Sequence, residues 1–234
     1  MAGIRIDEPV PRAEPGRWTG FAPAILGTEV LPAPTRPPER PFADVLRARR
    51  SRLGAAVGWG RVADLLWHAN GATGEAAVGR AGLPVARRPA PSPGGLHAIY
   101  AVCIDEAGDL PRLYEPAGHR FHALKVDPRE IGARNAAAVA AVAGTHRGCT
   151  IRFIADLAKA SAAYRTPESL VLREAGCLLT IHCLCAEWLG LTACPLGFLG
   201  QDLVGPLGFP TGRFLAVGAV QVGEACPVTV PTAG

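Results

Sequence analysis

Three short segments, far apart along the chain, contain residue types that can hold a phosphorylated planar ligand. The first spans residues 47–52 and surrounds Ser51 with Arg49, Arg50 and Arg52. Guanidinium groups bind phosphate through paired, charge-assisted hydrogen bonds, and a serine hydroxyl adds a further donor. The pattern indicates a phosphate site, and a solvated basic helix end is the alternative interpretation.

The other two segments are rich in glycine and proline. Residues 91–97 read Pro-Ser-Pro-Gly-Gly-Leu-His, and paired glycines let a backbone approach a ligand closely and donate its N–H groups. Residues 190–198 read Gly-Leu-Thr-Ala-Cys-Pro-Leu-Gly-Phe and follow a long apolar segment. An ordinary turn and an ordinary loop are the alternatives for these two segments.

Signatures of several other kinds of site are missing from the sequence. The histidines and cysteines do not cluster at metal-ligand spacing, so we expect no metal site. Ser51 and Ser92 lack the G-x-S-x-G context of a hydrolase nucleophile, and neither a G-x-G-x-x-G nor a Walker motif occurs. His182 lies in an apolar segment and is expected to be a core histidine.

Taken in order, the three segments resemble the nitroreductase superfamily, in which an "RRS" segment takes the phosphate of FMN. There a "PS-x-G" loop binds the flavin ring, and a "GLG-x-x-P-x-G-F" stretch lies over it. The resemblance implies FMN as the cofactor, with phosphate held by Arg49, Arg50, Ser51 and Arg52. It implies ring contacts from five further residues, namely Ser92, Gly94, Gly95, Leu196 and Gly197.

A closer resemblance is to the SagB-like peptide azoline dehydrogenases, and it covers roughly residues 42–222. It is carried by PSPGGLHAIY at 91–100, by LPRLYEPAGHRFHAL at 110–124 and by AYRTPESLVLREAGCLL at 163–179. It implies a homodimer that holds each flavin between its subunits and oxidises a peptide or natural-product intermediate, with biosynthetic enzymes as possible partners. The family's Lys-Tyr pair removes the departing proton, so Tyr164 is the expected catalytic residue.

The chain departs from the family pattern at three positions. The family lysine is Ala163, the family arginine is Pro167, and the basic residue expected after Ser51 is Leu53. Two alternatives to a dehydrogenase therefore remain open. One is an NAD(P)H-dependent nitro or quinone reductase, and the other is a non-catalytic nitroreductase-like subunit of a biosynthetic complex.

Composition predicts a globular, cytoplasmic protein. Of its 234 residues 49% are hydrophobic and 19% charged, and the net charge of +4 is too mild for a nucleic-acid partner. Seven cysteines without a C-x-x-C pair indicate reduced thiols. The charged, proline-containing start does not resemble a signal peptide, and the longest uncharged helical run, residues 175–186, is too short to span a bilayer.

The elements that must position these segments can be predicted from hydrophobic periodicity. We expect a Pro-rich arm at 1–40, a nitroreductase-like domain at 41–224 and a tail at 225–234. Within the domain, helices are predicted at 42–53, 60–70, 128–142, 156–164, 168–190 and 199–208, and strands at 97–104, 112–114, 122–126, 150–155 and 213–222, with a short strand at 28–31 in the arm. Strands and helices without a βαβ rhythm predict an α+β fold, with a central mixed or antiparallel sheet flanked by helices.

The segment 168–190 gives the strongest helix signal. Thr166 could cap it, Pro167 suits its first turn, and Gly190 suits its exit. Apolar residues occupy most of its circumference, so we expect a buried, central helix. Its second face needs a partner, which is consistent with a homodimer.

Overall fold

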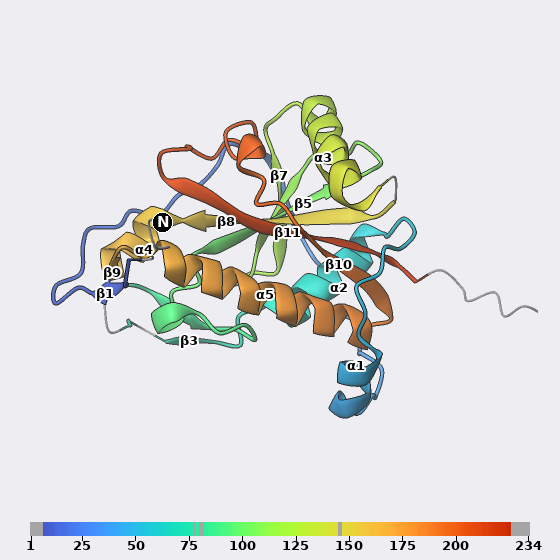
Figure 1. The fold of residues 1–234 in the computed structure, drawn as a ribbon, viewed down its shortest axis with the longest axis horizontal. Coiled ribbons are helices and arrows are strands. Elements are labelled where there is room, and N and C mark those ends of the chain that lie inside the picture. The colour runs from blue at the N-terminus through green and yellow to red at the C-terminus, as the bar shows by residue number, and fades with distance from the viewer. Residues whose placement is uncertain (1–6, 77, 80–81, 145–146, 226–234) are drawn as a thin grey trace, which may run out of the picture.

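A computed structural model describes residues 7–76, 78–79, 82–144 and 147–225, and its centre is an antiparallel sheet (Figure 1). The sheet has seven strands in the order β10-β11-β8-β5-β6-β7-β2, and every neighbouring pair is antiparallel. In that order the strands are β10 (Leu191–Leu196), β11 (Phe214–Glu224), β8 (Cys149–Asp156), β5 (Ile99–Asp105), β6 (Arg112–Glu115), β7 (Arg120–Leu124) and β2 (Ile25–Val30).

Helices cover both faces of this sheet. They are α1 (Phe42–Ala48), α2 (Trp59–Asn70), α3 (Pro128–Ala143), α4 (Leu157–Ala163) and α5 (Glu168–Trp188), with short 3₁₀ turns η1 (Pro93–Gly95) and η2 (Gln201–Leu203). Helix α5 runs along one face with α2 beside it, and α3 lies on the other face (Figure 1). Two small ladders pair β1 (Val10–Pro11) with β9 (Tyr164–Arg165), and β3 (Gly74–Ala76) with β4 (Val85–Arg87).

The burial pattern explains this layering. All eight residues of β8 are buried, because a central strand covered on both faces has no solvated side. On the α5 face, Phe153 and Ala101 pack with Leu178 in one core cluster. On the α3 face, Ile154 packs with Ile131 and Leu203 in a second cluster. The α+β prediction with an antiparallel sheet is confirmed.

Most predicted elements are present, and the differences have local causes. No strand is predicted from the sequence at 190–198, but Leu191–Leu196 forms edge strand β10, paired with β11 over six positions. The helix predicted at 42–53 ends at Ala48, and the one at 199–208 is only the 3₁₀ turn η2 with further turns. Thr166 does not cap α5, because its Oγ1 donates to the Glu8 carbonyl instead.

The described part of the Pro-rich arm is extended and lies over the body. Its strand β1 pairs with β9, and the backbone N–H groups of Arg12 and Gly16 donate to the carbonyls of Ala163 and Ala162. Its strand β2 adds the last strand of the central sheet. Backbone hydrogen bonds thus tie the arm to the domain at two places, at β9 and at β7. Residues 226–234 of the predicted tail lie outside the described residues.

Helix α5 is long and apolar enough to cross a membrane when judged by length and composition alone. In the fold it packs against β10, β11 and α2, as the core helix that the sequence predicts. The cysteines within the described ranges are all free thiols.

Candidate functional site

The arginine segment leaves α1 and runs beside the edge strand β10. Ser51 forms a parallel bridge with Ala193, and the backbone N–H of Arg52 donates to the Ala193 carbonyl at 3.1 Å. This pairing fixes the backbone of the segment next to the C-terminal end of α5. The side chain of Ser51 remains exposed.

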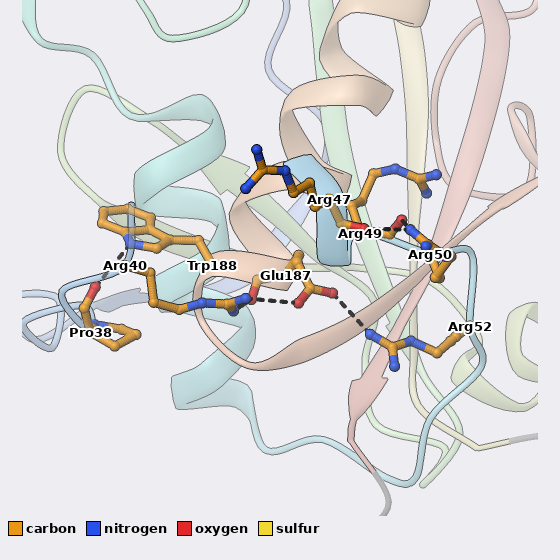
Figure 2. Close-up of polar contacts among 8 residues, drawn as sticks. All are labelled: Pro38, Arg40, Arg47, Arg49, Arg50, Arg52, Glu187 and Trp188. Carbon is orange, nitrogen blue, oxygen red and sulfur yellow. Dashed lines mark hydrogen bonds and ion pairs between the residues drawn. The ribbon is translucent and has the colours of Figure 1, made fainter. Parts of the chain in front are cut away.

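Two of the four predicted phosphate ligands are engaged by the protein itself (Figure 2). Arg52 forms an ion pair with Glu187 at 2.9 Å, and Arg40 meets the same carboxylate at 3.2 Å. The Nη1 atom of Arg50 donates to the carbonyls of Arg47 and Arg49 at 2.7 and 2.8 Å, which satisfies exposed carbonyls at the end of α1. These two arginines therefore hold the segment in place.

Arg49 differs from its neighbours, because its guanidinium has neither a hydrogen bond nor an ion pair with any described residue. Figure 2 shows it pointing away from the Glu187 cluster. It is half-buried, and its charge acts on the thiol of Cys183 in α5. Burial raises the pKa of Cys183 to about 11, and Arg49 opposes that shift. A partly desolvated guanidinium without a counter-ion favours an anion.

The glycine loop is a tight turn built on left-handed backbone. Gly94 and Gly95 have φ angles of 62° and 68°, which side chains with a Cβ adopt only with strain. The Ser92 hydroxyl accepts a hydrogen bond from the backbone N–H of His97 at 2.8 Å and so closes the turn. The loop is thus shaped for close approach by another group.

Tyr164 lies directly beside this loop. A Cβ built on Gly94 would stand 3.2 Å from its hydroxyl oxygen. The half-buried ring packs with Leu83, Leu96 and Ala163 and borders a cavity of about 470 Å³. Pro11, Arg12 and Ala13 of the arm line the same cavity.

Lys159 does not lie where the SagB-like pattern would have a lysine beside Tyr164. Its Nζ donates to the Leu96 carbonyl at 2.5 Å and lies over the Trp18 ring, 5.2 Å from the centroid. It lines a different cavity from the one beside Tyr164.

The predicted ring contacts after α5 fall at the end of β10. The Leu196 side chain is buried against Val139 and Ala219, so it faces the α3 side of the sheet and leaves only its backbone for a ligand. A Cβ on Gly197 would meet nothing within 4 Å, so the surface there is open.

The site residues form two groups that α5 holds apart. Arg49 lies near Cys183, whereas the glycine loop lies near Glu174. Nine residues of α helix separate these positions, which corresponds to about 13 Å along the axis. Within one chain the structure therefore joins Tyr164 to the glycine loop, and Arg49 to Ser51, but does not join the two groups.

Glu174 is a buried ionisable residue that the sequence reasoning did not single out. It is 5% exposed, and burial raises its pKa to about 7, although the Ser92 hydroxyl, Arg88 and Lys159 each lower it. It supports the glycine loop from beneath through Ser92. Its position could have been noticed in the sequence, since Glu174 lies within the segment AYRTPESLVLREAGCLL that carries the family resemblance.

Comparison with known proteins identifies the fold. No protein-family model matches the sequence, and no curated protein matches it either. A crystal structure from Ralstonia eutropha JMP134, of a protein named as a nitroreductase, superimposes with a TM-score of 0.65 at 19% identity, over 91% of this chain and 98% of that chain. A Desulfovibrio desulfuricans protein, named as a nitroreductase in complex with FMN, gives a TM-score of 0.51 at 19% identity, over 84% and 93%.

A third similar structure is the Escherichia coli microcin synthetase McbBCD complex with truncated pro-MccB17 bound. Its TM-score is 0.56 at 17% identity, over 85% of this chain and 78% of that chain. The chain therefore has the nitroreductase fold, and at these identities the likeness establishes the fold alone.

Proposed function

We propose that this chain is an FMN-dependent oxidoreductase that acts as a homodimer. The observation that carries the proposal is the half-buried guanidinium of Arg49, which has no partner among the described residues and lies next to the exposed Ser51 in a nitroreductase fold. The D. desulfuricans protein of the same fold is crystallised with FMN, which supports the choice of anion. Arg49 would hold the phosphate, with the Ser51 hydroxyl as a second donor and Arg50 and Arg52 as nearby positive charge.

The outer face of α5 supports the dimer. Leu172, Gly176, Thr180 and Leu184 lie four residues apart along one line of the helix, and the first three are exposed. Phe42 and Leu46 of α1 are also exposed, at 66% and 50%. An apolar face with small residues is well suited to close helix contact.

A dimer would also bring the two groups of site residues together across the subunit interface. If two copies of α5 packed antiparallel about a two-fold axis near its middle, the Glu174 end of one copy would face the Cys183 end of the other. The glycine loop of one subunit would then approach Arg49 of its partner. Each flavin would lie between subunits, with its phosphate on one chain and its ring against the other.

FMN would supply two-electron transfer at its flavin ring. The chain's own residues would bind the phosphate and position the ring through the backbone at Gly94 and Gly95. The substrate would bind in the cavity of about 470 Å³ beside the Tyr164 hydroxyl. We infer a peptide or natural-product intermediate as the substrate, since the similar microcin synthetase structure contains a bound pro-peptide. A biosynthetic partner enzyme is part of the same proposal.

Two alternatives have their own support. Ala163 leaves Tyr164 without a neighbouring lysine, which favours a non-catalytic subunit of a biosynthetic complex. The similar structure from Clostridium acetobutylicum, named as an NADH oxidase with a TM-score of 0.51 at 15% identity, favours an NAD(P)H-dependent reductase. Rapid bleaching of bound flavin by NADPH would identify the reductase. A protein that stays colourless with added FMN would identify the non-catalytic subunit.

The test is an FMN titration followed by the visible spectrum and by flavin fluorescence. Arg49→Gln should weaken FMN binding about 10- to 100-fold, because a hydrogen bond to a charged group is worth about 1.5–3 kcal/mol. Arg134→Gln is the matched control, since Arg134 lies on α3 in an exposed ion pair with Glu130. Equal affinity of the Arg49 variant and wild type would remove Arg49 from the site.

A further inference from the structure

A second cavity, here called the arm cavity, lies between the N-terminal arm and the central sheet. Its volume is about 290 Å³. Trp18 and Phe21 of the arm, Tyr100 of β5 and Tyr114 of β6 supply aromatic walls, and Arg88 and Lys159 also line it. It is separate from the cavity beside Tyr164 and from the Arg49 segment, so the proposed flavin site does not account for it.

The cavity forms where two strands of the sheet separate. Strands β5 and β6 are paired only through Val102 with Leu113 and Cys103 with Arg112. Strand β5 nevertheless begins at Ile99 and β6 continues to Glu115, so their facing ends diverge. The arm covers the gap, and Trp18 is fixed there by a 2.9 Å hydrogen bond to Asp156.

Two cations, Arg88 and Lys159, face this cavity, and neither forms an ion pair with a carboxylate among the described residues. The Nε atom of Arg88 is buried and finds no acceptor among the described residues. Burial lowers the pKa of both Arg88 and Lys159, and the charge of Arg88 lowers that of Lys159 further. The two positive charges therefore destabilise one another in a poorly solvated place, and an anion between them would relieve this repulsion.

The nearby carboxyl groups either already have hydrogen-bond and ion-pair partners or have a raised pKa. Glu115 accepts from the Gly118 backbone at 3.0 Å and pairs with Arg120 at 3.8 Å. Asp156 is held by Arg213 at 2.6 Å. Glu174, on the far side of Arg88, has its pKa raised by burial to about 7 and so balances at most one charge.

His97 adds no charge to the cavity. Its Nε2 lies 2.9 Å from the Ala86 carbonyl and donates to it, and burial lowers its pKa to about 4. The neutral ring is part of the cavity wall. The fixed positive charges at the cavity are therefore those of Arg88 and Lys159, while His122, which also lines it, shares a 2.8 Å hydrogen bond with the Thr28 hydroxyl.

We propose that the arm cavity binds a small aromatic carboxylate, with its carboxylate between Arg88 and Lys159 and its ring against Trp18, Phe21 and Tyr100. A cavity of about 150 Å³ accommodates benzene, so this one has room for a ring and a short acidic side chain. Arginine suits a carboxylate because its planar donors match both oxygens. The acid is either a free aromatic acid or the C-terminal aromatic residue of a peptide.

The experiment is isothermal titration calorimetry on the full chain, whose heat signal does not depend on flavin chemistry. The probes are 3-phenylpropionate, its neutral amide, and the peptide Gly-Gly-Phe with a free or amidated C-terminus. We expect at least one of the two acids to bind at least tenfold more tightly than its amide. Tighter binding of 3-phenylpropionate would indicate a free aromatic acid as the ligand. Tighter binding of Gly-Gly-Phe would indicate the C-terminal residue of a peptide.

Two variants test the residues, each with a matched control. Arg88→Met and Lys159→Met should each weaken binding of the acid at least tenfold and bring it close to that of the amide. Arg134→Met and Lys125→Met remove exposed cations elsewhere and should leave binding unchanged. If Arg88→Met fails to fold, Lys159→Met carries the test.

Three results would overturn the proposal. They are the absence of binding by both acids at 10 mM, equal affinity for each acid and its amide, and wild-type affinity in the folded cavity variants. A protein that binds FMN but neither acid would refute the arm cavity while leaving the flavin site intact. A protein that binds an acid but no FMN would support the arm cavity and refute the flavin site.

Discussion

Glu174, beneath the glycine loop, couples the stability of the fold to pH. Its pKa rises on folding from 4.5 to about 7 because the side chain is buried. The folded state then binds the proton more tightly than the unfolded state, so the stabilisation is complete below pH 4.5 and is lost as pH rises through 7. At about 1.36 kcal/mol per pKa unit, this shift lowers the free energy of unfolding, relative to its value at low pH, by about 1 kcal/mol at pH 5 and about 3 kcal/mol at pH 8.

Glu174→Gln keeps the size of the side chain and removes its ionisation. The advantage of the variant over wild type in free energy of unfolding should therefore grow by about 2 kcal/mol between pH 5 and pH 8. His97 and His182, whose pKa values burial lowers to about 4, titrate in both proteins and cancel from the comparison.

The assay is urea unfolding of both proteins at pH 5, 6, 7 and 8, at one protein concentration. Glu130→Gln, which removes an exposed carboxylate on α3, is the control and should show a difference from wild type that does not change with pH. A constant difference between Glu174→Gln and wild type across the series would refute the reasoning, because it would mean that the buried carboxylate does not titrate in this range.

Three further perturbations test the glycine loop, the α5 surface and the arginine segment. Gly94→Ala should lower the free energy of unfolding by about 1–2 kcal/mol, because its φ of 62° disfavours a Cβ, whereas Gly132→Ala within α3 should raise it by about 0.5–1 kcal/mol. Chemical denaturation measures both, and equal effects would contradict the strained backbone at Gly94. Thr180→Arg should give a monomer near 24.3 kDa by light scattering, where wild type gives twice that mass, and a dimeric variant would place the interface elsewhere. Glu187→Gln should cost about 1 kcal/mol and speed amide hydrogen exchange over residues 38–52, since the carboxylate holds two arginines there, and unchanged exchange would show that the segment is held by other contacts.

The sequence determined most of the elements and the class of fold. The apolar periodicity of 168–190 predicts a central helix, and strands and helices without a βαβ rhythm predict an α+β fold. The periodicities that reveal these elements depend on residues only a few positions apart. The Gly94-Gly95 pair and its turn were readable for the same reason, since backbone preference is a local property. Strand β10 could not be predicted, because Gly190 and Gly197 flank it and Pro195 lies within it. Its pairing with β11 decides its conformation.

Only the tertiary structure decided which of the predicted ligands are free to bind. The arginine segment presents equivalent side chains in sequence, yet Arg52 pairs with Glu187, which lies 135 positions away, while Arg49 has no such partner among the described residues. The arm cavity likewise depends on Arg88 and Lys159 meeting across segments that are distant in the chain. Charge pairing and burial depend on distance in space, which local sequence patterns do not encode.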